Sequence, residues 1–106
     1  MFSIMQGDSY SIAVEILDGN KEIVSEDRIS DVEIAIGTLI KSYVKKEITY
    51  DSETGKWMFP LTQEETFSYI PSIVDCTVRV RWTNGDVEGT RVKDVRILES
   101  VSKEVL

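Results

Sequence analysis

The sequence predicts an all-β protein: an immunoglobulin-like antiparallel β-sandwich with one short helix, formed by a single domain over residues 1–106. Short runs of alternating apolar and polar residues recur along the chain, and turn residues separate them about every eight to twelve positions. One dipeptide, Asn84-Gly85, is the strongest short-range hairpin signal in the chain. A small closed barrel of the same strands is the alternative architecture.

Alternation defines the strands in the first part of the chain. Residues 10–17 carry apolar side chains on both faces, which predicts a strand buried on both sides. A shorter strand is expected at residues 21–25, followed by one helical turn or a polar loop. Residues 31–36 alternate as in a half-buried strand. Gly37 then predicts a bulge or a bend before the chain continues in extended form.

The middle of the chain predicts a hairpin. Its strands are residues 47–50 and 57–59, and the loop 51–55 ends in a glycine placed for positive φ. Lys45-Lys46 before it is expected to form a tight turn. Pro60 ends the second strand, because proline cannot donate a ladder hydrogen bond.

A short helix should follow this hairpin. Thr62 and Glu65 match a capping box, in which the threonine caps the helix and the glutamate reaches back to the threonine backbone. Pro71 limits the helix to about one or two turns, because the residue before proline disfavours helical backbone angles.

The clearest alternation in the sequence predicts a strand over Val74–Trp82. A two-residue turn at Asn84-Gly85 then pairs Trp82 with Val87. With that pairing, the apolar residues further along one strand no longer lie opposite apolar residues of the other. One extra residue near Gly89 restores the match, so the sequence predicts a β-bulge there.

Composition and charge exclude several classes of function. The chain has 12 Lys and Arg against 19 Asp and Glu, and the net charge of −7 disfavours nucleic acid and anionic membrane as partners. It has no histidine, the commonest general base and metal ligand. The one cysteine, Cys76, cannot form an internal disulfide, and we expect it to be an inert core residue. No stretch reads as a signal peptide or a membrane span.

Three fragments of known motifs fail on inspection. The glycine of loop 51–55 comes one position too early for an EF-hand. Thr54-Gly55-Lys56 resembles the end of a phosphate loop, but it lacks the upstream glycine and the following Ser or Thr. Glu64 and Glu65 are read as solvated surface, since adjacent acids are common in an acidic chain. We therefore assign no catalytic residue, no cofactor and no metal ligand, and expect a protein that is not an enzyme.

Five residues are candidates for contact with a partner: Trp57, Arg79, Arg81, Trp82 and Arg91. Alternation places Arg79 and Arg81 on one outward face, suited to an acidic partner subunit. RNA is the other ligand for such a face, and the net negative charge weighs against it. Trp57 and Trp82 either pack in the core or mark an interface at a sheet edge, and the sequence leaves both readings open.

Six segments of the chain together resemble a known family: Gln6–Tyr10, Val32–Gly37, Trp57–Thr66, Val78–Trp82, Asn84–Val87 and Glu99–Leu106. The family consists of small proteins encoded in prophages and tailed phages of Firmicutes, near virion structural genes. In the N-terminal turn and the strand order, the chain is also similar to the N-terminal immunoglobulin-like domain of phage baseplate upper proteins. The Lys45-Lys46 turn, where a glycine is expected, departs from the pattern.

This resemblance implies a structural or assembly protein of a virion, placed in the baseplate, tail, connector or head. Its expected partners are other phage structural proteins, and we expect a homo-oligomer without nucleic acid or membrane. The expected location is the virion, after synthesis in the cytoplasm of the bacterial host. A binding module for a host carbohydrate or a host protein is the alternative.

Overall fold

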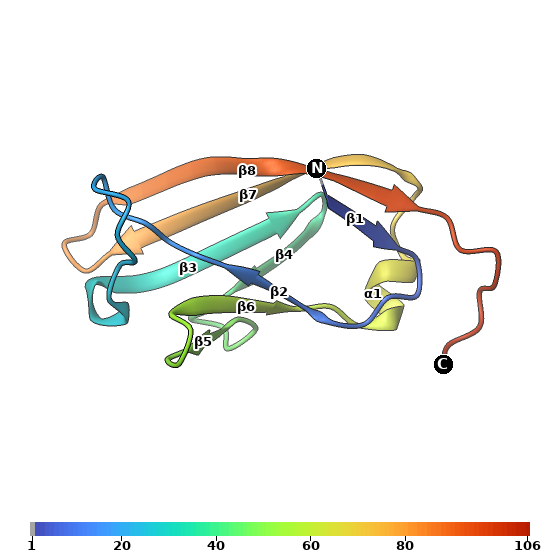
Figure 1. Cartoon of the computed structure of the whole chain (residues 1–106), viewed down its shortest axis with the longest axis horizontal. Helices are drawn as coiled ribbons and strands as arrows, with labels where there is room; N and C mark the ends of the chain where they lie inside the picture. The colour runs from blue at the N-terminus through green and yellow to red at the C-terminus, as the bar shows by residue number, and fades with distance from the viewer. Residues whose placement is uncertain (1) are drawn as a thin grey trace.

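The computed structural model describes residues 2–106, so Met1 of the predicted domain lies outside the described part. Within that range the chain forms eight strands, one short α-helix and a 3-10 turn (Figure 1). The elements, in order, are β1 (Phe2–Met5), β2 (Ser11–Val14), η1 (Glu26–Arg28), β3 (Ile29–Ile36), β4 (Leu39–Ser42), β5 (Thr49–Asp51), β6 (Lys56–Pro60), α1 (Gln63–Phe67), β7 (Ser72–Trp82) and β8 (Val87–Leu98).

The strands form two separate sheets of unequal width. The large sheet has the order β1-β8-β7-β3-β4, and the small sheet has the order β2-β6-β5. Figure 1 shows the two sheets as layers, with α1 at one end. The all-β sandwich with one short helix is therefore confirmed over the barrel. One strand pair departs from the antiparallel pattern, because β1 lies parallel to β8.

The apolar core lies between the sheets and follows the alternation of the central strands. Val32, Ile34 and Ile36 of β3 are fully buried, and Trp57 and Phe59 of β6 face them from the small sheet. Successive side chains of a strand point to opposite faces, so each of these strands gives one face to the core. Burial also raises the pKa of the Cys76 thiol on β7, which disfavours the reactive thiolate.

The capping box of α1 is confirmed. The Thr62 hydroxyl accepts from the Glu65 N–H at 3.2 Å, and the Glu65 carboxylate accepts from the Thr62 N–H at 2.9 Å. One turn later, the buried Thr66 hydroxyl accepts from the Gly7 N–H and donates to the Asp8 carbonyl, both at 2.9 Å. These bonds fix the helix against the turn between β1 and β2 and close that end of the sandwich.

Tyr69, just after α1, gives an expected pH dependence. Burial, followed by the nearby Glu65 and Cys76, raises the pKa of Tyr69 to about 12, and its hydroxyl donates to the Ile36 carbonyl. The folded state therefore holds this proton more tightly than the unfolded chain. We expect the stability contribution to be complete below pH 10 and to be lost as the pH rises toward about 12, by about 2–3 kcal/mol in all.

Urea unfolding over a series of alkaline pH values measures this loss. Tyr69→Phe should cost about 1 kcal/mol at neutral pH, from the lost hydrogen bond, and should flatten the alkaline decline. If the variant and the wild-type chain lose stability equally between pH 10 and 12, Tyr69 is not the responsible group.

Three segments differ from the predicted strands and turns. The strand predicted at residues 10–17 is shorter, and only one of its faces is covered: Ile12, Val14 and Ile16 are partly or fully buried, whereas the odd-numbered residues between 11 and 17 are exposed. At residues 21–25 there is a single bridge, from Leu17 to Ile23, in place of a strand. At Gly37, where a bulge or a bend is predicted, the chain makes a tight two-residue hairpin turn. The glycine has φ at 61°, and Ile36 lies directly opposite Leu39.

The turn between β7 and β8 is longer than predicted. The pairing of Trp82 with Val87 is wrong, because the Trp82 N–H donates to the Asp86 carbonyl at 2.8 Å. A two-residue turn of this kind needs positive φ at both central residues, but of Asn84 and Gly85 only the glycine has it, at 96°. The result is a three-residue loop in which the glycine takes the left-handed conformation.

The β-bulge of β8 lies at Val92, so its predicted place near Gly89 is also wrong. The bulge shifts the alternation of the strand by one residue. Lys93 is consequently paired with Cys76, and its side chain lies on the inner face of the large sheet. This placement shapes the candidate site.

Candidate functional site

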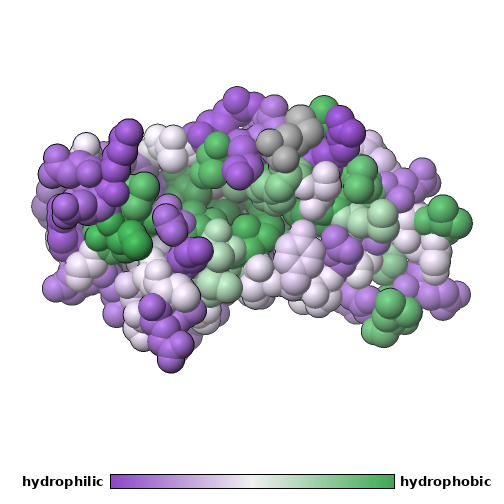
Figure 2. Space-filling view, viewed as in Figure 1, coloured by the Kyte–Doolittle hydropathy of each residue, from purple (hydrophilic) through white to green (hydrophobic). Residues whose placement is uncertain are grey.

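An open, largely apolar groove of about 620 Å³ lies between β2 and the inner face of β7 and β8. Its floor is the apolar face of β7 with the facing residues of β8, and its wall is formed by Tyr10 and by Ile12 to Leu17. Figure 2 shows it as a hollowed band of apolar surface along this side of the molecule, bordered by hydrophilic side chains. A pocket of this size and character suits a ligand or a chain segment.

The groove is open because the sheets do not match in width. β1 pairs only with Val95–Leu98, so the first part of β8 has no neighbour on that side. The small sheet ends at β2 and does not reach over β8. Residues 87–93 are therefore exposed along both faces of the strand. This part of β8 carries two apolar side chains, Val87 and Val92, which are 58% and 43% exposed. Nothing among residues 2–106 covers them.

β2 offers a free backbone edge to the groove. The Tyr10 carbonyl accepts from the Leu61 N–H at 2.8 Å, so the even-numbered residues of this stretch point their hydrogen-bonding groups at β6. The groups of Ser11, Ala13 and Glu15 then point the other way, toward the groove. They have no ladder partner in the described part of the chain.

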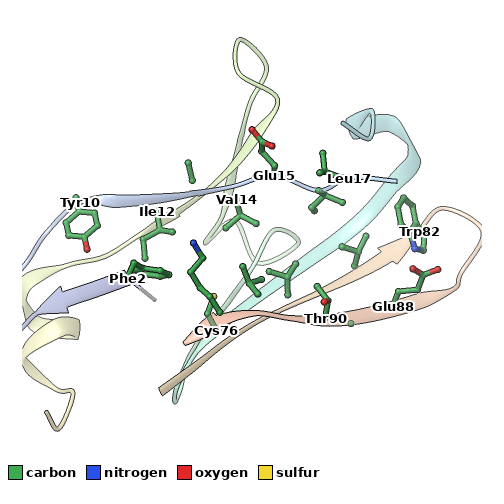
Figure 3. A pocket seen from close by; sticks show the side chains of 17 residues that line it. Phe2, Tyr10, Ile12, Val14, Glu15, Leu17, Cys76, Trp82, Glu88 and Thr90 are labelled. Carbon is green, nitrogen blue, oxygen red and sulfur yellow. The ribbon is translucent and has the colours of Figure 1, made fainter. Parts of the chain in front are cut away.

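The two ends of the groove carry opposite charge. Figure 3 shows Phe2, Tyr10 and Ile12 at one end, and Trp82 with Glu88 at the other. At the first end, the Lys93 ammonium lies 5.6 Å from the centre of the Phe2 ring.

Lys93 and Glu88 both lie in the lining. Within residues 2–106, neither forms a salt bridge. The groove therefore presents one free cation and one free anion, separated by apolar surface.

Trp57 is a core residue, which corrects its place among the candidate contact residues. It is 0% exposed and packs against Tyr43 and Tyr50, with ring centres 4.9 and 4.8 Å away. Its strand, β6, is the middle strand of the small sheet, so its inward side chains have neighbours on every side. Trp57 offers no surface to a partner.

The three arginines lie together on the outer face of the large sheet, away from the groove. The Arg79 guanidinium forms a bidentate ion pair with the Glu33 carboxylate, with N–O distances of 2.9 and 3.1 Å. Arg91 bonds to Asp75 at 3.0 Å and to Asp94.

Arg81 is the third of these arginines, and it donates only to the Ser30 hydroxyl at 3.3 Å. Acidic neighbours thus neutralise most of this face, which leaves little basic surface for an acidic partner.

Trp82 is the one predicted contact residue that lines the groove. Its ring is partly buried, its Nε1 has no hydrogen-bond partner within residues 2–106, and the Arg28 guanidinium lies 5.7 Å from the ring centre. The sequence does not predict the rest of the lining, above all the β2 wall. The apolar residues on both faces of residues 10–17 are the available signal, but alternation alone predicts that they are buried on both sides.

Comparison with known proteins adds no relative: no protein-family model matches the chain, and neither does any curated protein. Among residues 2–106, no helix is long and apolar enough to cross a membrane. Within this same range, no three side chains that could bind a metal ion lie together. The groove is the strongest candidate site in the described structure.

Proposed function

We propose that this protein is a non-enzymatic structural or assembly module of a phage virion, and that it docks on other virion proteins through the groove between β2 and β8. The observation that carries the proposal is an apolar groove beside a free strand edge. The resemblance to small phage proteins supports the virion setting, in a baseplate, tail, connector or head. The protein would be made in the host cytoplasm and assembled there.

A free strand edge next to an apolar floor fits an extended chain segment better than a compact ligand. The edge supplies backbone hydrogen bonds at Ser11, Ala13 and Glu15, and the floor accepts alternate side chains. Proteins usually cover or charge such edges, because an exposed edge pairs readily with other chains. An edge left open beside uncovered apolar residues therefore supports a role in protein contact.

Mass spectrometry of purified virions from an induced lysogen tests the proposal. The wild-type chain should be present, and Val92→Glu should be depleted, because it places a charge in the groove lining. Val87→Glu is the matched control: the same change on the same strand, at a residue on the outer face. Absence of the wild-type chain from virions, or equal incorporation of both variants, would contradict the proposal.

One observation favours the alternative of a carbohydrate-binding module. Tyr10 and Trp82 stand at opposite ends of the groove, and the Glu88 carboxylate adjoins the second (Figure 3). Aromatic rings with a nearby carboxylate can hold a sugar by stacking and hydrogen bonds. Saturable binding on a glycan array that Trp82→Ala removes would favour this function over the first.

A further inference from the structure

We propose that the groove binds the C-terminal segment Glu99–Leu106 of a second copy of this chain, as a strand added alongside β2. The inference rests on the proposed docking role of the groove and names its partner. Three features of the segment support a second copy as the partner: its exposed apolar side chains, its length and the order of its charges.

The segment Glu99–Leu106 has no regular secondary structure and carries exposed apolar side chains. Val101 and Leu106 are fully exposed, and Val105 is 63% exposed. In Figure 1 the segment leaves the end of β8 and runs along the outside of the molecule. Its contacts with the rest of the chain are polar, chiefly from the Ser100 N–H and the Lys103 ammonium to the Gln6 side chain. Releasing it would therefore break mainly polar contacts.

The segment Glu99–Leu106 is long enough to span the groove. Its eight residues can lie alongside the stretch from Tyr10 to Leu17 that contains the groove wall. Eight residues in a strand extend about 27 Å. The backbone groups of Ser11, Ala13 and Glu15 can then pair along most of the added strand.

The charges of the segment match the groove in order and spacing. Glu99, Val101, Lys103 and Val105 share one face of an extended segment, because side chains alternate. On the groove floor, Lys93 lies opposite Cys76 and Glu88 opposite Val80, which are four residues apart on β7.

Glu99 and Lys103 are also four residues apart, about 13 Å in a strand. One register therefore sets Glu99 against Lys93 and Lys103 against Glu88. In that register Val101 faces Thr90, and Val105 faces the Trp82 end of the groove. The added strand then runs parallel to β2 and antiparallel to β8.

The segment cannot make this register in its own chain. Glu99 lies six residues beyond Lys93 along the same strand direction, a separation of about 20 Å. The segment leads away from the groove of its own chain, so a second copy must supply the strand that binds there. In its own chain the only salt bridge that Lys103 forms within residues 2–106 is an exposed contact with Glu99 at 3.9 Å, which costs little to give up, and its hydrogen bond to Gln6 would be exchanged for the contact with Glu88.

Charge reversal tests the register in the full-length protein, with association measured by sedimentation velocity across a concentration series. The wild-type chain should associate as its concentration rises. Lys103→Glu and Glu88→Lys should each weaken association about tenfold, equivalent to about 1.4 kcal/mol, because like charges then meet. An equimolar mixture of the two variants should recover it, since the altered segment of one fits the altered groove of the other.

Lys45→Glu is the matched control, because it makes the same charge change at an exposed loop residue far along the chain from the groove lining. It should associate like the wild-type chain. Monomeric wild-type protein at every concentration, failure of the mixture to recover, or equal weakening by the control would each overturn the proposal. Thermal unfolding of all variants confirms that they fold. A monomeric wild-type chain that still enters virions would overturn self-docking alone and leave the virion role standing.

Discussion

Replacing Trp57 with alanine should lower the free energy of unfolding by about 3–5 kcal/mol, the largest loss expected from any single side chain here. Trp57 is the largest fully buried residue, and it lies against the rings of Tyr43 and Tyr50. Its removal takes a large apolar surface from the core, and it also leaves a cavity between the sheets. Urea unfolding followed by tyrosine fluorescence or circular dichroism measures the change.

Trp57→Phe is the informative comparison. It keeps an aromatic ring against the tyrosines, and it removes an Nε1 group that is buried without a hydrogen-bond partner in residues 2–106. Loss of an unsatisfied donor partly offsets the lost volume, so this variant should cost distinctly less than Trp57→Ala. Equal losses for both variants would mean that the ring contacts contribute little.

Lys41→Met should cost about 2–3 kcal/mol by breaking the ion pair between β4 and α1. The Lys41 ammonium donates to the Glu65 carboxylate at 2.9 Å and to the Pro60 carbonyl at 2.6 Å. The lysine side chain is only 10% exposed and the glutamate 26%, so the substitution leaves the Glu65 carboxylate without its partner and with limited access to water. The residual exposure of the glutamate keeps the loss below that of a fully buried pair. Lys56→Met is the control, because its pair with Glu15 is long and exposed and should contribute under about 0.5 kcal/mol.

The same substitution should change the acid side of the stability profile. Burial raises the pKa of Glu65, but hydrogen bonds from Lys41 and from Thr62 outweigh it and hold the pKa below its ordinary value of 4.5. The folded state then favours the charged carboxylate, so this contribution is present above pH 4.5 and is lost as the pH falls through the folded pKa. Lys41→Met should therefore show a shallower loss of stability on acidification. If Lys41→Met and the wild-type chain lose the same stability on acidification, other carboxylates are responsible for that loss.

Local patterns predicted the parts of the fold that depend on neighbours in sequence. The alternation in β3 and β7 and the capping box at Thr62 each depend on a few adjacent residues, and the structure has all three. The register of β7 and β8 failed because it depends on one backbone angle at Asn84, which composition does not determine. The parallel pairing of β1 with β8 joins residues 2–5 with residues 95–98, which are far apart in the sequence, so no local pattern predicts it.

The candidate site was harder to predict than the fold, since it depends on sheet width. Trp57 and Trp82 both sit on strands with clear alternation, yet one is in the middle of a sheet and the other beside its open margin. Their difference in exposure comes from which strands stop short, and that is a property of the assembled sandwich. The groove wall at β2 escaped prediction for the same reason.

The bulge at Val92 has a consequence for solubility and selectivity. An open edge beside apolar residues invites indiscriminate stacking of strands and, with it, aggregation. The bulge places both Val92 and Lys93 in the groove lining, and an inward lysine discourages any strand that lacks an acidic residue at the matching position. The inward Lys93 ammonium thus makes this surface selective. Replacing Lys93 with an apolar residue would leave the edge without that protection.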